Sequence, residues 1–178
     1  ERVRQRHWQA MHDAGLDPNP PTLGIPTHRL EDLPGVWAPG LVVEVSARVK
    51  HLRDHGGVVF VTLTNAGQNV QAVLSRDAVG STALEDVRRY ADTGDLIRVT
   101  GALGESRNGT PSVLVAGWSM EAKSLRPVPF RGLDKPEARL RDRSADLVVH
   151  PAHAQVLRQR SAIIGAVRQV LVNEGYLE

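Results

Sequence analysis

The sequence has no cysteine among its 178 residues, which excludes disulfide bonds, thiolate zinc sites and cysteine nucleophiles. It also has no run of 18 apolar residues, so we expect no helix that spans a membrane. Its first residues lack the pattern of a secretory signal peptide. Because the sequence starts at Glu1 and not at a methionine, we expect it to be a fragment of a longer product.

Lysine is scarce: it occurs three times, so arginine supplies 19 of the 22 cationic side chains. Arginine binds phosphates and base edges through its forked guanidinium, although a genome rich in arginine codons gives the same ratio. The net charge is +2; residues 36–124 sum to zero, and residues 1–8 and 125–178 sum to +2 and +3. This is not the basic surface of a typical duplex-DNA binder, so any nucleic-acid binding would depend on local sites.

Patterns typical of catalysis are also missing. No pair of carboxylates is placed for acid–base chemistry, and residues 56–60 (GGVVF) lead into a strand, unlike a phosphate-binding loop. We expect no catalytic residue, no metal and no cofactor in these residues. The seven histidines show no metal-ligand spacing on a shared face, and we interpret them as surface residues: His7, His12, His28, His51, His55, His150 and His153.

The apolar pattern predicts a small β-barrel in the middle of the chain. The expected elements, in order, are strands at 42–52, 58–64 and 69–75, a helix at 83–91, and strands at 96–103 and 112–121. This order is typical of the OB-fold, a five-stranded Greek-key barrel. An SH3-like barrel is the alternative, but it has no helix of this length between its third and fourth strands.

The flanks of the barrel differ from it in composition. We expect three regions: an N-terminal helix and Pro-rich linker (1–40), the barrel (41–124), and a connector with the start of a second domain (125–178). The expected flanking elements are a helix at 1–14 that Gly15 ends, an extended linker at 17–40, a loop at 125–136, a short helix at 137–146 and an amphipathic helix at 154–174.

Phe60 is the strongest candidate for a binding residue. It has the opposite strand parity to Val59, Val61 and Leu63, so it faces solvent if those three face the core. An exposed aromatic on an OB-fold face is a platform for base stacking, although Phe60 could instead cap the core at a bulge. Candidate polar partners on the same face, which could equally be an ordinary solvated surface, are Arg48, Arg53 and Gln71.

Three stretches of the sequence, which together with the start Gly15-Leu16-Asp17-Pro18 cover nearly all of it, carry a family resemblance. The first consists of 47–49 and 56–63, and the second is 94–101. The third is the most specific; it begins at Lys123 and ends at Arg160-Ser161-Ala162-Ile163. These stretches resemble the bacterial lysyl-tRNA synthetases, which are class II enzymes. The resemblance implies an N-terminal OB-fold that grips the tRNA anticodon, followed by a catalytic domain.

The resemblance also implies roles for individual residues. By position, Phe60 would stack on an anticodon base, Gln71 would read a base edge, and Arg53 would lie near the anticodon phosphates or bases. The full set of residues that we expect to bind the anticodon is Arg48, Arg53, Phe60, Gln71 and Asn108.

The sequence departs from the family pattern at three places. Asn65 replaces the usual Asp, Thr110 replaces a Glu of the anticodon site, and Ser144-Ala145 replace an aromatic residue and a leucine. These departures predict a diverged member. The hairpin Asn108-Gly109-Thr110 and Trp118 look more like the synthetase part of actinobacterial proteins that join a lysyl-tRNA synthetase to a membrane lysyl-lipid transferase.

The C-terminal residues 160–178 resemble the motif 1 helix of class II synthetases, which leads to the dimer interface in that family. Motifs 2 and 3, whose arginines hold ATP, do not occur in this sequence, so we expect it to be inactive alone. The resemblance implies a full-length protein that is a homodimer and ligates lysine to tRNA with ATP and magnesium. It would be cytoplasmic, or attached to the membrane in the fused form.

Two other functions stay open at this point. A non-catalytic interaction or dimerisation module, with nucleic-acid binding lost, fits the neutral barrel and the missing acidic residue at Thr110. A nonspecific single-strand binder fits less well, because it would expose more aromatic side chains than Phe60 alone.

Overall fold

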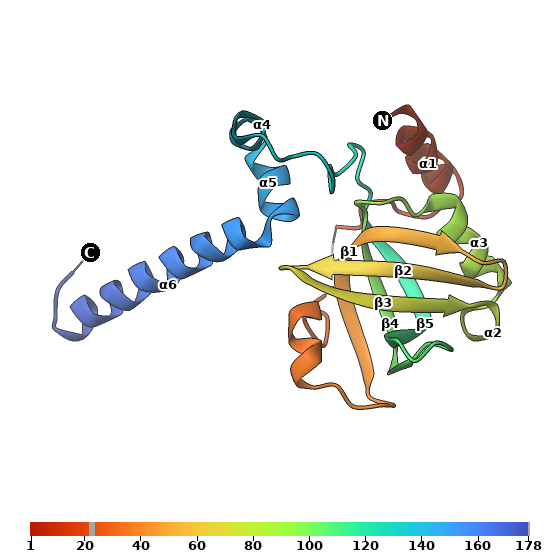
Figure 1. Ribbon diagram of the computed structural model, residues 1–178, viewed down its shortest axis with the longest axis horizontal. Coiled ribbons are helices and arrows are strands. Elements are labelled where there is room, and N and C mark those ends of the chain that lie inside the picture. Colours follow the sequence, from red (N-terminus) through yellow and green to blue (C-terminus); the bar gives the residue numbers. More distant parts are fainter. Residues whose placement is uncertain (22–23, 178) are drawn as a thin grey trace. The chain divides into compact units, whose positions relative to one another are not determined.

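The computed structural model describes residues 1–21 and 24–177. It divides into two compact units, Glu1–Val128 and Pro129–Glu178, and each is described by itself below. The first unit holds all the strands, and the second is helical (Figure 1).

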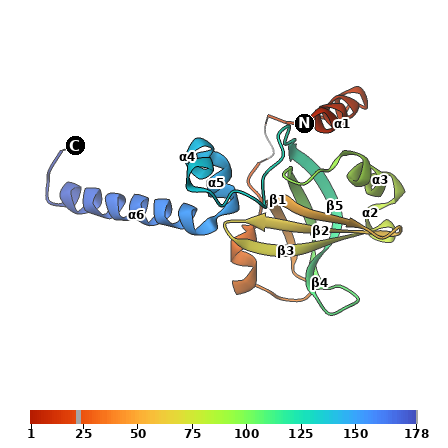
Figure 2. The ribbon, with the colours of Figure 1, turned by 45° about the horizontal axis from the view of Figure 1, so that its top comes forward.

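The first unit is a closed barrel of five strands in the order β1-β2-β3-β5-β4 (Figures 1 and 2). The strands are β1 (Val42–Asp54), β2 (Val58–Asn65), β3 (Gln68–Ser75), β4 (Leu96–Glu105) and β5 (Pro111–Ala122). All neighbours pair antiparallel except β3 and β5, which pair parallel over three residues each. The prediction of an OB-fold is confirmed.

Alternation of buried and partly exposed residues along β1 to β4 builds most of the core. In β1 the side chains of Val43, Val45, Ala47 and Val49 are buried, and the residues between them are partly exposed. Each buried valine or leucine contributes roughly 1.5–3 kcal/mol. Two helices follow β3: the short α2 (Arg76–Val79), which the sequence pattern did not predict, and α3 (Ser81–Tyr90). The face of α3 predicted to be apolar is buried, namely Leu84, Val87 and Tyr90.

The N-terminal helix α1 (Arg2–Asp13) ends two residues before Gly15, the glycine that was predicted to stop it. Gly15 has a φ of +75°, and its N–H donates to the His12 carbonyl at 3.0 Å. The N–H of Leu16 donates to the Met11 carbonyl at 2.9 Å. These two bonds form a Schellman motif, in which a glycine adopts the left-handed conformation without a steric penalty.

The prediction that 17–40 is only an extended linker is wrong for its second half. A 3-10 helix, η1 (Leu30–Gly35), forms there and packs against β1, β2 and β3. Leu30 and Leu33 lie on the same side of this helix, because three residues make one 3-10 turn, and both are fully buried. Asn65 at the end of β2 fixes η1 by donating to the Glu31 carboxylate at 3.0 Å.

The second unit contains α4 (Pro136–Arg141), α5 (Arg143–Val149) and α6 (Pro151–Asn173). The single helix predicted at 137–146 is therefore two helices. The break falls at Asp142, whose carboxylate accepts a hydrogen bond from the Ala145 N–H at 3.0 Å and so caps α5. The end of the stretch that resembles motif 1, Glu178, lies outside the described residues.

Nearly every residue of α6 is exposed, including the apolar side chains that the periodicity singled out. Across residues 1–21 and 24–177, none of the helices is both long and apolar enough for a membrane span.

Candidate nucleic-acid interface

Phe60 lies on the outer face of the barrel. Its neighbours in β2, Val59 and Val61, are buried, whereas Phe60 itself is only half-buried. The strand register places Phe60 opposite Arg53 of β1 and Val73 of β3. The prediction from strand parity, that Phe60 faces outward, is confirmed.

Arg53 and Gln71 join Phe60 on this face. The guanidinium carbon of Arg53 lies 5.9 Å from the centre of the Phe60 ring, within the range of a cation–π interaction. Its Nη2 donates to Oε1 of Gln71 at 3.2 Å. The barrel thus brings together three of the five residues predicted to bind the anticodon, Arg53, Phe60 and Gln71.

A polar chain extends from Gln71 to the β4–β5 hairpin. Nε2 of Gln71 donates to the Ser112 hydroxyl at 3.0 Å, and that hydroxyl donates to the Thr110 carbonyl at 2.8 Å. Ser112 is fully buried, so its hydroxyl holds the Gln71 amide from the side of the barrel core. Sequence reasoning missed Ser112, because its register opposite Gln71 depends on the parallel pairing of β3 with β5.

His55 completes the surface around Phe60. Its ring lies 5.5 Å from the Phe60 ring, centre to centre, in an edge-on arrangement. His55 was expected only as a surface residue, and it is exposed. The sequence signal that could have placed His55 near Phe60 is its position in the β1–β2 turn, five residues before Phe60. We refer to Arg53, His55, Phe60, Gln71 and Ser112 as the Phe60 cluster.

Comparison with known proteins agrees with this geometry. Residues 43–128 match the tRNA anticodon family, described as an OB-fold nucleic acid binding domain. The barrel is an OB-fold nucleic-acid-binding domain. The OB-fold domain and its flanks are similar to "Lysylphosphatidylglycerol biosynthesis bifunctional protein LysX" of Nocardia farcinica, with 39% identity over 180 residues. This match covers 99% of the chain and 16% of that relative.

Proteins with the same name from other organisms are similar too. The identity is 39% over 179 residues with the protein of Mycolicibacterium gilvum, which covers 99% of this chain and 16% of the relative. It is 38% over 138 residues with that of Mycobacterium tuberculosis H37Rv, which covers 76% and 12%. The chain thus spans about a sixth of the length of the curated relatives it matches most fully.

The other two predicted binding residues of the OB-fold domain lie outside the Phe60 cluster. Arg48 of β1 pairs with β2 at Thr64 and with β4 at Leu96, and its guanidinium donates to the Gly94 carbonyl. Burial lowers the pKa of Arg48, and the charge of nearby Asp95 acts in the opposite direction. Asn108 is exposed in the β4–β5 turn, two residues before Thr110.

A buried ionic network holds the end of β5 in the OB-fold domain. The Lys123 side chain is fully buried, and its Nζ donates to the Tyr90 carbonyl at 2.6 Å, to Asp95 at 2.7 Å and to Asp92. His7 of α1 lies 2.9 Å from the same Asp92 oxygen. His7 is therefore not a plain surface residue, as the sequence suggested, but a link between α1 and the barrel.

In the second unit, His150 and His153 also differ from the surface residues that the sequence predicted. His150 and His153 converge on the carboxylate of Asp146, and one ligand atom from each of the three residues lies within 4.8 Å of the others. The sequence spacing shows no shared metal face, because residues 146, 150 and 153 come together only at the corner between two helices.

Proposed function

We propose that the OB-fold domain binds the anticodon loop of a tRNA and that Phe60 stacks on one of its bases. The observation that carries the proposal is the outward Phe60 ring with Arg53 and Gln71 beside it. Base stacking on an aromatic ring contributes about 1–3 kcal/mol per base, and single-stranded loops expose the bases that such a ring needs.

Gln71 and Arg53 supply the polar part of the proposed site. The Gln71 amide offers one acceptor and two donors, and its present partners, Arg53 and Ser112, are side chains that a base edge can replace. Arg53 is exposed, so its charge is available to a phosphate. Because residues 36–124 carry no net charge, we expect few phosphate contacts and a shallow dependence of affinity on salt.

The activity of the complete protein is a further part of the proposal. The curated relatives are named as bifunctional proteins of lysylphosphatidylglycerol biosynthesis. This chain covers about one-sixth of their length. We infer that the OB-fold domain serves a lysyl-tRNA synthetase part of such a protein. That part would ligate lysine to tRNA with ATP and magnesium, and would act as a homodimer.

The test is a titration of this chain with a lysine-tRNA anticodon stem-loop and with the same stem-loop carrying a scrambled anticodon, at two salt concentrations. We expect tighter binding to the first RNA. Phe60→Ala should weaken that binding by about 1–3 kcal/mol. Phe60→Leu should weaken it nearly as much, because it keeps apolar bulk but removes the ring.

Val42→Ala is the matched control, since Val42 is exposed on β1 and pairs with β4, not β2. It should bind like the parent. Equal binding of both RNAs would contradict anticodon recognition, and parent-like binding by Phe60→Ala would contradict stacking.

A second candidate is an interaction module that no longer binds nucleic acid. The observation that favours it is the exposed apolar side chains of α6, which include Val156, Ile163, Val167 and Val170, each more than half exposed. This function predicts no binding to either RNA, together with a sedimentation coefficient that rises with protein concentration.

A further inference from the structure

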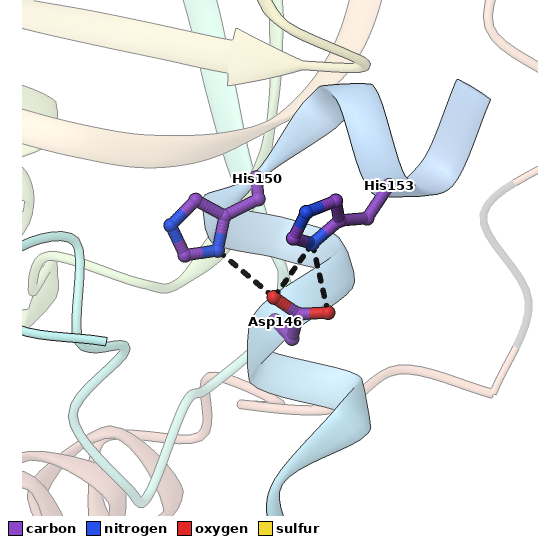
Figure 3. A group of neighbouring side chains, drawn as sticks. All are labelled: Asp146, His150 and His153. Atoms are coloured by element: carbon purple, nitrogen blue, oxygen red, sulfur yellow. Dashed lines mark hydrogen bonds and ion pairs between the residues drawn. The ribbon is translucent and has the colours of Figure 1, made fainter. Parts of the chain in front are cut away.

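The corner between α5 and α6 gathers two imidazoles around one carboxylate (Figure 3). Nδ1 of His150 lies 2.9 Å from Oδ1 of Asp146. Nδ1 of His153 lies 2.9 Å from the same oxygen and 3.0 Å from Oδ2. Two imidazole nitrogens thus converge on one carboxylate.

The backbone fixes this arrangement. The His150 N–H donates to the Asp146 carbonyl at 2.8 Å, and the His153 N–H donates to the His150 carbonyl at 3.0 Å. These bonds join the end of α5 to the first turn of α6, so the three side chains project from one continuous corner. The donor set therefore needs no rearrangement of the backbone to assemble.

Asp146 has a cationic partner on the side away from the two histidines' shared oxygen. Its side chain is fully buried, and Arg143 pairs with its Oδ2 atom. A carboxylate held by an outer partner is a common arrangement in metal sites.

The donors are nearly at the spacing that a metal requires. Zinc binds His nitrogen at about 2.0–2.1 Å and carboxylate oxygen at about 2.0–2.2 Å in a tetrahedral arrangement, which separates neighbouring donors by about 3.3 Å. The two Nδ1–Oδ1 separations are 2.9 Å, a few tenths of an ångström short of that spacing, and the three ligand atoms all lie within 4.8 Å of one another.

A pocket gives access to the same group. It has a volume of about 350 Å³, and it is lined by Pro136, Arg139, Leu140, Arg143, Asp146, His153 and Val156. Of its two arginines, Arg143 is paired with Asp146. The side chains of His150 and His153 are 26% and 36% exposed. Water or another small ligand can therefore occupy a fourth coordination position, as in zinc sites with three protein ligands.

We propose that Asp146, His150 and His153 bind a zinc ion at this corner, with the fourth position open to the pocket. Each neutral imidazole would move its proton from Nδ1 to Nε2, and the freed Nδ1 lone pair would coordinate the metal. No net proton is released by this tautomer change. The site is independent of the Phe60 cluster and of the proposed anticodon binding.

The test is a calorimetric titration of the metal-free chain with Zn²⁺, repeated in excess Mg²⁺. We expect one equivalent to bind. Magnesium should not compete, because it prefers oxygen ligands in octahedral geometry. His150→Ala and His153→Ala should each weaken zinc binding at least about tenfold. His12→Ala removes an exposed histidine of α1 and should leave the affinity unchanged.

Thermal unfolding provides a second measurement, and its result for the parent does not depend on how well the variants fold. Zinc should raise the midpoint for α4–α6 in the parent, because a ligand that binds only the folded state stabilises it. It should leave the midpoint of the double variant His150→Ala/His153→Ala unchanged. Equal zinc affinity of the parent and the double variant, or no zinc effect on the parent's midpoint, would overturn the proposal and leave the cluster as a hydrogen-bonded helix corner only.

Discussion

At the scale of single residues, Gly101 shows how closely β4 and β5 approach. The pairing register shifts between Thr100 and Gly101, which marks a β-bulge. A Cβ atom built on Gly101 would overlap the backbone carbonyl of Leu114 in β5. A backbone atom cannot swing aside as a flexible side chain can, so the position requires glycine.

We therefore expect Gly101→Ala to lower the free energy of unfolding of the barrel by about 3 kcal/mol, the upper part of the range for overpacking. Gly117→Ala is the control, since Gly117 lies in β5 with open space around its Cβ position and without a positive φ. Gly117→Ala should leave the free energy of unfolding unchanged. Urea unfolding of the two variants measures the difference. Equal free energies of unfolding would contradict the prediction, because they would show that β4 and β5 can move apart at little cost.

The contacts of a single residue can be predicted from the sequence when they are made with its neighbours along the chain, and not when they depend on how the strands pair. Strand parity left two positions open for Phe60, outward or capping the core, and the burial of Val59, Val61 and Leu63 decides for the outward one. Ser112 and His55 could not be assigned to the cluster, because their contacts depend on which strands close the barrel and on the shape of a turn. Arg48 has the right parity, but only the fold reveals that the Gly94 carbonyl already holds its guanidinium.

At the scale of elements, the Lys123 network joins the end of β5 to α1 and to the loop after α3. Asp92 accepts from both Lys123 and His7. Burial would raise the pKa of Asp92, but these hydrogen bonds and the charges of Lys123 and His7 lower it. An aspartate with a lowered pKa stabilises the fold above its ordinary value near 4 and loses that contribution as the pH falls below it.

We expect Lys123→Met to destabilise the first unit by about 3–5 kcal/mol at pH 7, because it leaves two carboxylates without their buried partner. The free energy of unfolding of the parent should fall below about pH 4, and that of the variant should fall less. Lys50→Met removes a lysine that is bound only to exposed Asn69 and should change stability by less than about 0.5 kcal/mol. Thermal melts between pH 3 and 7 measure both effects; a full parental pH response in Lys123→Met would contradict this role of Asp92.

Predictability of elements depends on their length. The five strands and α1, α3 and α6 each span enough residues for their apolar period to show. The 3-10 helix η1 does not, because it buries only Leu30 and Leu33 within a segment rich in proline. The division of 137–146 into two helices depends on one capping residue, Asp142, which an apolar pattern does not register.

At the scale of the whole molecule, the two units differ in how much they bury. The first contains almost all the buried apolar residues, whereas in the second only Leu133 and Asp146 are buried among the described residues. Stability is unevenly distributed in such a chain.

We expect amide hydrogens of α6 to exchange about a thousandfold faster than those in the middle of β1 and β4, whose exchange requires opening of the barrel. Mass-spectrometric hydrogen exchange at low protein concentration measures this difference. Protection of α6 that grows with concentration would instead identify a second copy as the cover of its apolar side chains.

The parallel pairing of β3 with β5 closes the barrel with three register pairs, the fewest of any strand pair in the ring, and the first is Gln71 with Ser112. The side chains of the same two residues are hydrogen-bonded across that seam. If the Gln71 amide binds a base as proposed above, it must release the Ser112 hydroxyl at the shortest strand pairing of the barrel. The proposed recognition of a base and the closure of the barrel would then compete for the same amide, and the cost of releasing Ser112 would subtract from the affinity for the base.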